Sequence, residues 1–249
     1  MGLENFKAFF ATNNWITVTG NTLFLNVLFI AATTITSVAI AIMLAEISNK
    51  WVKKITQSIV ILPHFMSWTI VSMLSVAILS ANGVVNQLIT MVGGKTIEFY
   101  NTPSVWPAIL VILKVWQGAG FGSIVYLATI TGIDASIYEA AAVDGASKTQ
   151  CIFKVTLPML KNTIIMLTIM SVGKIFNGDF GMIYAMVGSN SILYPTTDVI
   201  DTYLFRQLLE NPSMGQTAAV GLIQSILGFG FVVLCNKVAN KWSPESALF

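Results

Sequence analysis

The stretch Glu139-Ala-Ala-Ala-Val-Asp-Gly-Ala146, followed by Val155-Thr-Leu-Pro158, decides how this sequence folds. It is a polar, helix-forming segment in a chain of 249 residues that is otherwise strongly apolar. Hydrophobic residues make up 55% of the chain and charged residues 10%, against roughly 25% charged in a soluble domain. The mean hydropathy is +0.77, and a soluble protein of this length has no core large enough to bury so much apolar surface. The stretch therefore indicates a segment that leaves the membrane within a membrane protein.

Local signals predict two short helices in this segment. Asp134 can accept hydrogen bonds from the free amides of a first helical turn, and the alanines after Glu139 favour a helix and leave a smooth surface for a partner. Gly145 permits a turn, after which a second short helix is expected over residues 147–155. Pro158 suits the start of the next long helix, where a missing amide costs least. The pattern predicts a rigid projection joined to a spanning helix, and an ordinary amphipathic connecting loop is the alternative.

Five segments are long and apolar enough to span a bilayer, which needs about 20 residues. Because backbone polar groups inside a bilayer must be satisfied internally, each segment is expected to be helical. The predicted spans are Val18–Ala45, Ser58–Leu79, Val105–Ile130, Ile164–Met186 and Ala218–Val238. The predicted fold class is all-α, a polytopic transmembrane helical bundle, with residues 1–249 forming a single transmembrane domain.

The first residues, 1–16, are predicted to form an interfacial helix. Apolar side chains recur at helical spacing with charged ones between them, and Trp15 is placed as a residue of the aromatic belt. The apolar positions are Leu3, Phe6, Phe9 and Phe10, and the charged ones Glu4 and Lys7. An ordinary exposed turn is the alternative.

The basic residues predict the orientation of the chain. Eight of the thirteen fall in loops or a tail on one side of the predicted spans, and three fall on the other. The eight are Lys50, Lys53, Lys54, Lys148, Lys154, Lys161, Lys237 and Lys241; the three are Lys7, Lys95 and Arg206. The positive-inside rule makes the first side cytoplasmic. The N-terminus is then outside and the C-terminus inside, and the polar segment 132–160 lies in the cytoplasm.

Other classes of protein and site find little support. A net charge of +2 without a basic run does not indicate nucleic acid as a partner. Both cysteines, Cys151 and Cys235, fall on the predicted cytoplasmic side, which favours free thiols over a disulfide. The run Gly93-Gly-Lys-Thr96 lacks the first glycine of a phosphate-binding loop. His64 is the one histidine, so no histidine cluster can hold a metal.

A second glycine-rich run, Gly118-Ala-Gly-Phe-Gly122, does not match a dinucleotide-binding turn, because its third glycine is misplaced and no strand–helix–strand pattern surrounds it. Small residues in an apolar helix more often allow close helix packing. No nucleophile, base and orienting acid fall together. The chain is therefore not expected to be an enzyme, to hold a metal or to bind a cofactor.

The spacing of the polar stretch resembles the EAA motif: Glu-Ala-Ala, a glycine four residues after the second of these alanines, then a β-branched residue and Leu-Pro. The chain resembles permease subunits of carbohydrate-importing ABC transporters related to the maltose permeases. Within them it is similar to the polysaccharide, lipoprotein-type or alginate-type branch. Further matching stretches are Gly2-Leu-Glu-Asn-Phe6, Gly20-Asn-Thr-Leu23, Leu62-Pro-His-Phe-Met-Ser-Trp68, Gly122-Ser-Ile-Val-Tyr-Leu127, Gly132-Ile-Asp134 and Asp198-Val-Ile-Asp-Thr-Tyr203.

This resemblance implies a type I importer permease that moves an oligosaccharide across the bacterial cytoplasmic membrane by alternating access. It implies a second permease subunit, two ATPase subunits that hold ATP and Mg, and an external substrate-binding protein as partners. Segment 132–160 would be the cytoplasmic coupling helix. The residues it implies for coupling to the ATPase are Glu139, Ala140, Ala141, Asp144, Gly145, Val155, Leu157 and Pro158.

The sequence departs from the family pattern in three places. The family usually has a sixth helix before the stretch that matches Gly2–Phe6, and this chain starts just after it. Val155 replaces the usual isoleucine, which is a conservative change. Asn162 stands where a second proline often follows the first.

Polar residues inside the predicted spans are candidates for the transport path, because charge at membrane depth usually faces protein or water. A sugar needs hydrogen-bonding groups beside flat aromatic faces. Trp116 with Gln117, and Asn177 with Asp179, supply these types. A structural pair between Lys174 and Asp179 is the competing interpretation. A secondary transporter without an ATPase, or an importer of a solute other than a sugar, remains the alternative function.

Overall fold

The computed structural model describes residues 4–11, 14–210 and 214–242, and their regular secondary structure is entirely helical. The chain divides into two compact units. The first comprises Met1–Leu28, Met66–Leu113 and Lys174–Gly230, and the second comprises Phe29–Phe65, Lys114–Gly173 and Phe231–Phe249. The all-α expectation is confirmed, while the single domain over residues 1–249 stays a prediction.

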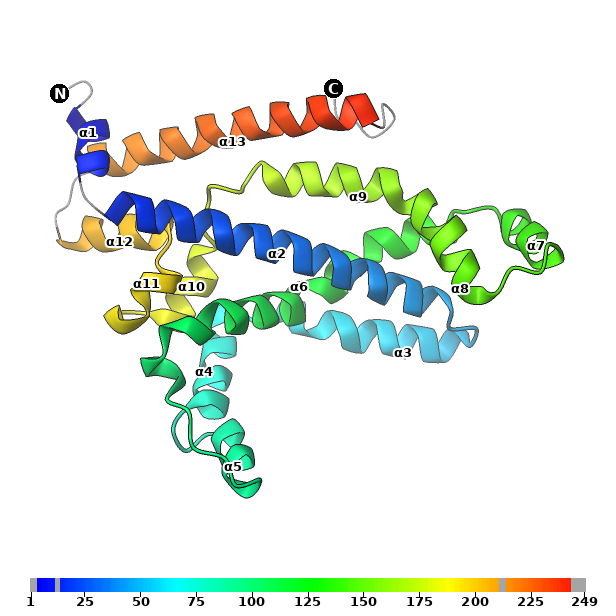
Figure 1. Ribbon diagram of the computed structural model, residues 1–249, viewed down its shortest axis with the longest axis horizontal. Coiled ribbons are helices and arrows are strands. Elements are labelled where there is room, and N and C mark those ends of the chain that lie inside the picture. The colour runs from blue at the N-terminus through cyan, green and yellow to red at the C-terminus, as the bar shows by residue number, and fades with distance from the viewer. Residues whose placement is uncertain (1–3, 12–13, 211–213, 243–249) are drawn as a thin grey trace. The chain divides into compact units, whose positions relative to one another are not determined.

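Three of the predicted spans occur as continuous helices (Figure 1): α2 (Asn14–Ala45), α6 (Trp106–Thr131) and α13 (Met214–Trp242). In the described part of the chain, five helical stretches are long and apolar enough to cross a membrane. They are Asn14–Ala45, Trp68–Met91, Pro103–Thr131, Lys148–Val172 and Gly215–Lys241. The number of spans agrees with the prediction, but two of the five have different limits.

The predicted span Ser58–Leu79 is wrong as a single helix. The chain there forms α3 (Lys50–Ile61), the short 3-10 helix η1 (Leu62–Phe65) and α4 (Trp68–Leu79). Pro63 lacks a backbone amide and cannot donate the hydrogen bond that would continue α3, although Leu62 before it keeps an α-helical conformation. The side chain of Ser67 then accepts a hydrogen bond from the Ile70 amide at 3.4 Å, which caps the new helix α4.

The predicted span Ile164–Met186 is also wrong as a single helix. Helix α9 (Leu157–Val172) ends at Gly173, and α10 (Phe180–Val187) begins after Asp179. Between them, residues 173–177 are turn and bend and residues 178–179 have no regular structure; Figure 1 shows this gap between α9 and α10. The gap itself carries the polar residues Lys174, Asn177 and Asp179, but apolar residues flank it on both sides, and the sequence prediction joined them into one span.

Shorter helices complete the described chain. The predicted interfacial segment 1–16 contains α1 (Glu4–Ala11), whose Phe10 ring lies edge-on to Trp15 with centroids 5.4 Å apart; Leu3 lies outside the described residues. The others are α5 (Val84–Met91), η2 (Phe99–Asn101), η3 (Pro103–Val105), α7 (Ala135–Val143), α8 (Lys148–Cys151), η4 (Ile152–Thr156), η5 (Ser191–Leu193), α11 (Tyr194–Thr197) and α12 (Ile200–Glu210).

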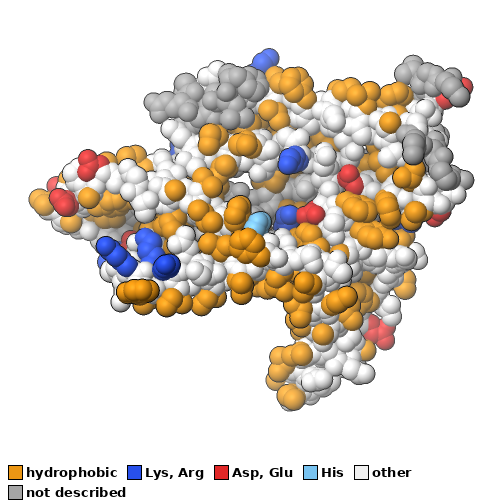
Figure 2. Space-filling view, turned by 180° about the vertical axis from the view of Figure 1, so that it is seen from behind, with side chains coloured by type: hydrophobic (Ala, Val, Ile, Leu, Met, Phe, Trp, Pro, Cys, Tyr) orange, Lys and Arg blue, Asp and Glu red, His pale blue; other side chains and the backbone are white. Residues whose placement is uncertain are grey.

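Each unit has its own apolar core. In the second unit, buried side chains of α2, α6 and α9 form one cluster: Val38, Ala41, Leu44, Tyr126, Leu127, Ile130 and Leu160. In the first unit, α2, α12 and α13 contribute Val18, Ile200, Tyr203, Leu204 and Val220. Many other large apolar side chains are exposed, and hydrophobic atoms are spread widely over the face in Figure 2. That distribution is typical of a surface that faces lipid or other subunits.

The glycine-rich run in α6 serves close helix packing, as expected. A Cβ on Gly120 would lie 2.0 Å from the carbonyl oxygen of Val60 in α3, so only glycine allows this approach. One residue along, the ring of Phe121 stacks on His64 with centroids 4.1 Å apart. The histidine is therefore a packed side chain of the second unit. The other glycine pair, Gly93-Gly94, follows the end of α5 and leads into a loop, so it does not open a helix as a phosphate-binding loop does.

Candidate functional site

Helix α7 begins as the sequence predicts. The carboxylate of Asp134 accepts a hydrogen bond from the Ser136 amide at 2.9 Å, and this bond lowers the pKa of the Asp134 carboxyl. The charged N-cap satisfies one of the free amides of the first turn. No residue of α7 is buried, so the helix is a projection whose surface is open to a partner.

The end of α7 explains the glycine of the motif. Gly145 has a φ of +77°, a left-handed conformation that glycine adopts without strain. The Ala146 amide donates to the carbonyl of Ala141 at 2.9 Å, and the Gly145 amide donates to that of Ala142 at 3.0 Å. This is the Schellman arrangement of helix ends, which fixes the direction in which the chain leaves α7.

The second short helix, predicted over residues 147–155, is not a separate element. A reciprocal capping box between Ser147 and Gln150 starts α8, and the helix then continues through the π-helical turn η4 directly into α9. Pro158 lies in the first turn of α9. A proline inside a helix removes a hydrogen bond and crowds the preceding turn, and the wider turn just before it accommodates this conflict. The projection is thus mechanically continuous with the spanning helix.

Two side-chain contacts that sequence reasoning missed hold the projection in place within the second unit. The hydroxyls of Tyr138 in α7 and Thr156 in η4 are hydrogen-bonded at 3.0 Å. The Lys148 ammonium lies 3.5 Å from the Glu46 carboxylate at the end of α2, in an exposed pair. Because these partners lie far apart in the sequence, spacing along the chain gives no signal for them.

The predicted coupling residues divide into an exposed and a half-buried set. Glu139, Ala140, Asp144, Gly145 and Pro158 are exposed, and Ala141, Val155 and Leu157 are half-buried. Two apolar neighbours that the sequence did not single out are also strongly exposed, Val143 at 87% and Phe153 at 65%. An acidic, alanine-smooth surface with exposed apolar side chains is suited to docking of another protein.

A second site lies in the first unit, at the break between α9 and α10. Its backbone is held by side chains from three other helices. Asn26 in α2 donates from its amide to the carbonyl oxygens of Ile175 and Asn177, each at 3.0 Å. Gln224 in α13, which is buried, donates to the carbonyl oxygen of Phe176 at 2.8 Å. Together with Asp201 in α12, whose contacts follow, Asn26 and Gln224 form a set that we call the backbone clamp.

Asp201 in α12 completes the backbone clamp. Its carboxylate accepts hydrogen bonds from the Gly178 amide and, at 3.3 Å, from the Gln224 side chain. A Cβ on Gly178 would lie 2.4 Å from the Val199 side chain, so this close approach requires glycine. Backbone groups released from a helix inside a membrane must find other partners, and the backbone clamp provides them on one side of the break.

The predicted path residues fall in different parts of the fold. Asn177 and Asp179 lie in the break; Asn177 is exposed, and Asp179 caps α10 by accepting from the Met182 amide at 3.2 Å. Trp116, which is 44% exposed, and Gln117 lie on α6 in the second unit. Their role in a path stays a prediction. In the described ranges no cluster of three metal-ligating side chains occurs.

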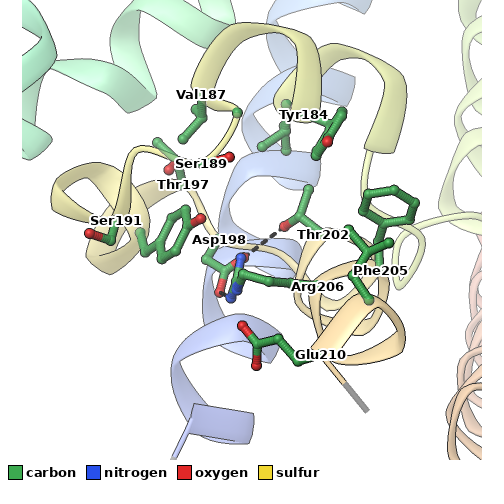
Figure 3. Close-up of a pocket in the computed structure, with 14 residues that line it drawn as sticks. Tyr184, Val187, Ser189, Ser191, Thr197, Asp198, Thr202, Phe205, Arg206 and Glu210 are labelled. Carbon is green, nitrogen blue, oxygen red and sulfur yellow. Dashed lines mark hydrogen bonds and ion pairs between the residues drawn. The ribbon is translucent and has the colours of Figure 1, made fainter. Parts of the chain in front are cut away.

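A pocket of about 500 Å³ lies within the first unit and is lined by residues between Ile183 and Glu210 (Figure 3). Arg206 makes a bidentate ion pair there with Asp198, at 2.6 and 3.2 Å, and its guanidinium lies 4.1 Å from the centre of the Tyr194 ring. Burial opposes the charge of Arg206, but the hydrogen bonds and charge of Asp198 outweigh it and raise the Arg206 pKa. The two charges satisfy each other and tie α12 to the end of α11.

Comparison with known sequences finds one family model that covers most of the chain. The model of the binding-protein-dependent transport system inner membrane component matches residues 37–241. A similar curated protein is the polygalacturonan/rhamnogalacturonan transport system permease protein YteP of Bacillus subtilis (strain 168). It is 31% identical over 98% of this chain and 76% of its own length.

Solved structures with the same fold also come from bacterial ABC transporters. The chain is 33% identical to a chain of a bacterial alginate ABC transporter in complex with an alginate pentasaccharide-bound periplasmic protein. The TM-score is 0.91, with 98% of this chain and 84% of that chain covered. A second structure, of a bacterial ABC transporter involved in the import of the acidic polysaccharide alginate, gives the same identity and TM-score with 85% of its chain covered.

Proposed function

Because this chain belongs to the family of binding-protein-dependent transport system inner membrane components, we propose that it forms the path by which an acidic oligosaccharide enters the cytoplasm. It is a permease subunit of an ABC importer. The observation that carries the saccharide assignment is the near end-to-end match, over 98% of the chain, both to a polygalacturonan permease and to the alginate transporter. Galacturonan and alginate are both chains of uronic acids, which carry a carboxylate on each sugar.

The partners follow from the same relationship. A second permease subunit completes the path, two ATPase subunits bind ATP and Mg, and an external binding protein delivers the saccharide. The exposed projection around α7 supports ATPase docking at Glu139 and the residues that follow it, because it is continuous through η4 with α9. A push on α7 is then carried into the helix that leads to the break.

A reconstituted transporter tests this function. We expect vesicles containing this chain with its permease, ATPase and binding-protein partners to accumulate trigalacturonate only when ATP is supplied on the cytoplasmic side. A variant ATPase that binds but does not hydrolyse ATP is the matched control. Accumulation driven by an ion gradient, without any ATPase subunit, would instead establish a secondary transporter. ATP-driven accumulation of an uncharged solute alone would refute the acidic-saccharide assignment.

The proposed orientation gives a labelling prediction. With Cys151 and Cys235 replaced by alanine, single cysteines at Asn49 or Ser147 are expected to be protected from an impermeant thiol reagent in intact cells. A cysteine at Asn101 should be labelled. All three positions are exposed in the fold, so protection reports the side of the membrane rather than burial. Labelling of position 147 from outside would reverse the topology and exclude α7 as the ATPase contact.

The path residues give a second prediction. Trp116→Ala and Asn177→Ala should each lower uptake per assembled transporter by about tenfold, because a lost stacking or hydrogen-bonding contact is worth about 1–3 kcal/mol and about 1.4 kcal/mol is tenfold. Basal ATP hydrolysis should persist, since α7 is unchanged. If the two side chains serve packing instead, assembly will fall first, while uptake normalised to assembled complex stays at the wild-type level.

A further inference from the structure

Lys174 is a cationic side chain displayed at the start of the break between α9 and α10. It follows Gly173, where α9 ends, and its side chain is exposed. Among the described residues it has no ion-pair or hydrogen-bond partner for its ammonium group. Asn177, the next exposed residue of the break, likewise leaves its side-chain amide without a partner in the described chain. Both exposed polar side chains are therefore available to a ligand.

The break lies at membrane depth, as two clamp residues indicate independently. Asn26 is 12 residues from the start of α2 and 19 from its end, which is about 18 Å and about 28 Å at 1.5 Å per residue. Gln224 is 10 residues from the start of α13 and 18 from its end, or about 15 Å and about 27 Å. Both side chains donate hydrogen bonds to backbone carbonyls of the break. The break therefore lies beside the interior, not the ends, of two membrane-length helices.

The surroundings of the break determine what Lys174 can face. The backbone clamp covers one side, where Asn26, Gln224 and Asp201 satisfy the backbone groups of residues 175–178. Irregular backbone at membrane depth is found where it is buried in protein or lines a water-filled cavity. A lysine there is costly unless it faces water, a ligand or an opposite charge. Lys174 is exposed at this break, which fits a residue that faces the transport path.

We propose that Lys174 recognises the carboxylates of an acidic oligosaccharide in the path. An ammonium group carries three donors and a full charge, so it can bind a carboxylate of successive uronic acid units without a fixed geometry. Asn177 lies near it in the break and can bind sugar hydroxyls. This inference rests on the proposed function, and it adds the residue that makes the path selective for charge. The backbone clamp consists of positioning residues that hold the break in this form.

The test compares trigalacturonate with its methyl ester, in which each carboxylate is neutral, in vesicles containing the complete transporter and saturating binding protein. Lys174→Met should lower ATP-driven uptake of trigalacturonate by about tenfold or more, since a hydrogen bond to a charged group is worth at least that factor. Uptake of the ester, relative to wild type, should not change. Lys174→Arg keeps the charge and should restore uptake of the acid. Lys95→Met is the matched control, because it also removes one lysine but from an exposed loop.

The outcomes separate this inference from the proposed function. Equal losses for acid and ester in assembled transporters would mean that Lys174 acts in a conformational step, and would overturn the inference. Loss of assembly in Lys174→Met would place the lysine against the second permease, and would overturn it as well. If the wild-type transporter imports the acid but not the ester, failure of Lys174→Arg to restore uptake of the acid would overturn the inference. If wild type imports neither saccharide, the proposed function itself fails and this inference with it.

Discussion

Glu139→Lys is expected to abolish coupling between ATP hydrolysis and uptake while leaving the subunit inserted in the membrane. Glu139 is exposed on α7, a helix without a buried residue, so the folded chain loses no internal contact. Reversing a charge in a docking surface places like charges together, which costs several kcal/mol. Uptake should therefore fall by about tenfold or more, since about 1.4 kcal/mol is tenfold.

The measurement is uptake and ATP hydrolysis by the purified complex, together with the amount of ATPase subunit that co-purifies. Glu98→Lys is the matched control, because Glu98 is also exposed but lies in a loop of the first unit. We expect wild-type uptake from the control. Normal uptake by a normally assembled Glu139→Lys complex would remove Glu139 from the ATPase contact.

The projection around α7 could be predicted from sequence because local signals determine it. Asp134 at the N-cap, the alanines of α7 and the left-handed Gly145 act within one or two helical turns, and each occurs as predicted. The long helices α2, α6 and α13 were predictable for a similar reason, since their apolar length exceeds what the bilayer requires. Local chemistry and length are both properties that a single sequence displays.

The break between α9 and α10 could not be predicted in this way. Apolar residues flank it on both sides, and the groups that replace the lost helical bonds are distant in sequence. Asn26 is separated by 149 and 151 residues from the two carbonyls to which it donates, and Gln224 by 48 residues from the Phe176 carbonyl. The two glycines and three polar residues of the break were hints, but glycine is common in membrane helices and polar residues inside a span also line transport paths. Polar Asn26 and Gln224 inside apolar spans were a signal that could have been read as interhelical bonds.

Asn26→Leu is expected to produce the largest loss of stability among single substitutions in the backbone clamp. Leucine keeps the size of the side chain but removes the two donors that satisfy Ile175 and Asn177. An unsatisfied buried carbonyl costs about 1–3 kcal/mol, and interhelical hydrogen bonds in membranes average less, about 0.6 kcal/mol. We expect a loss of about 1–3 kcal/mol, which lowers the Tm of a chain of this size by about 2–4 °C per kcal/mol.

Thermal aggregation of the detergent-solubilised subunit measures this loss, with Asn82→Leu in an exposed loop as the matched control. Gln224→Leu should also destabilise. Because Asn26 and Gln224 hold neighbouring carbonyls of one segment, the double variant should lose less than the sum of the two single losses. Once either bond is gone, the break can rearrange and the other bond contributes less. Strictly additive losses would show that the two side chains act on the break independently, and an unchanged Tm in Asn26→Leu would show that water satisfies these carbonyls instead.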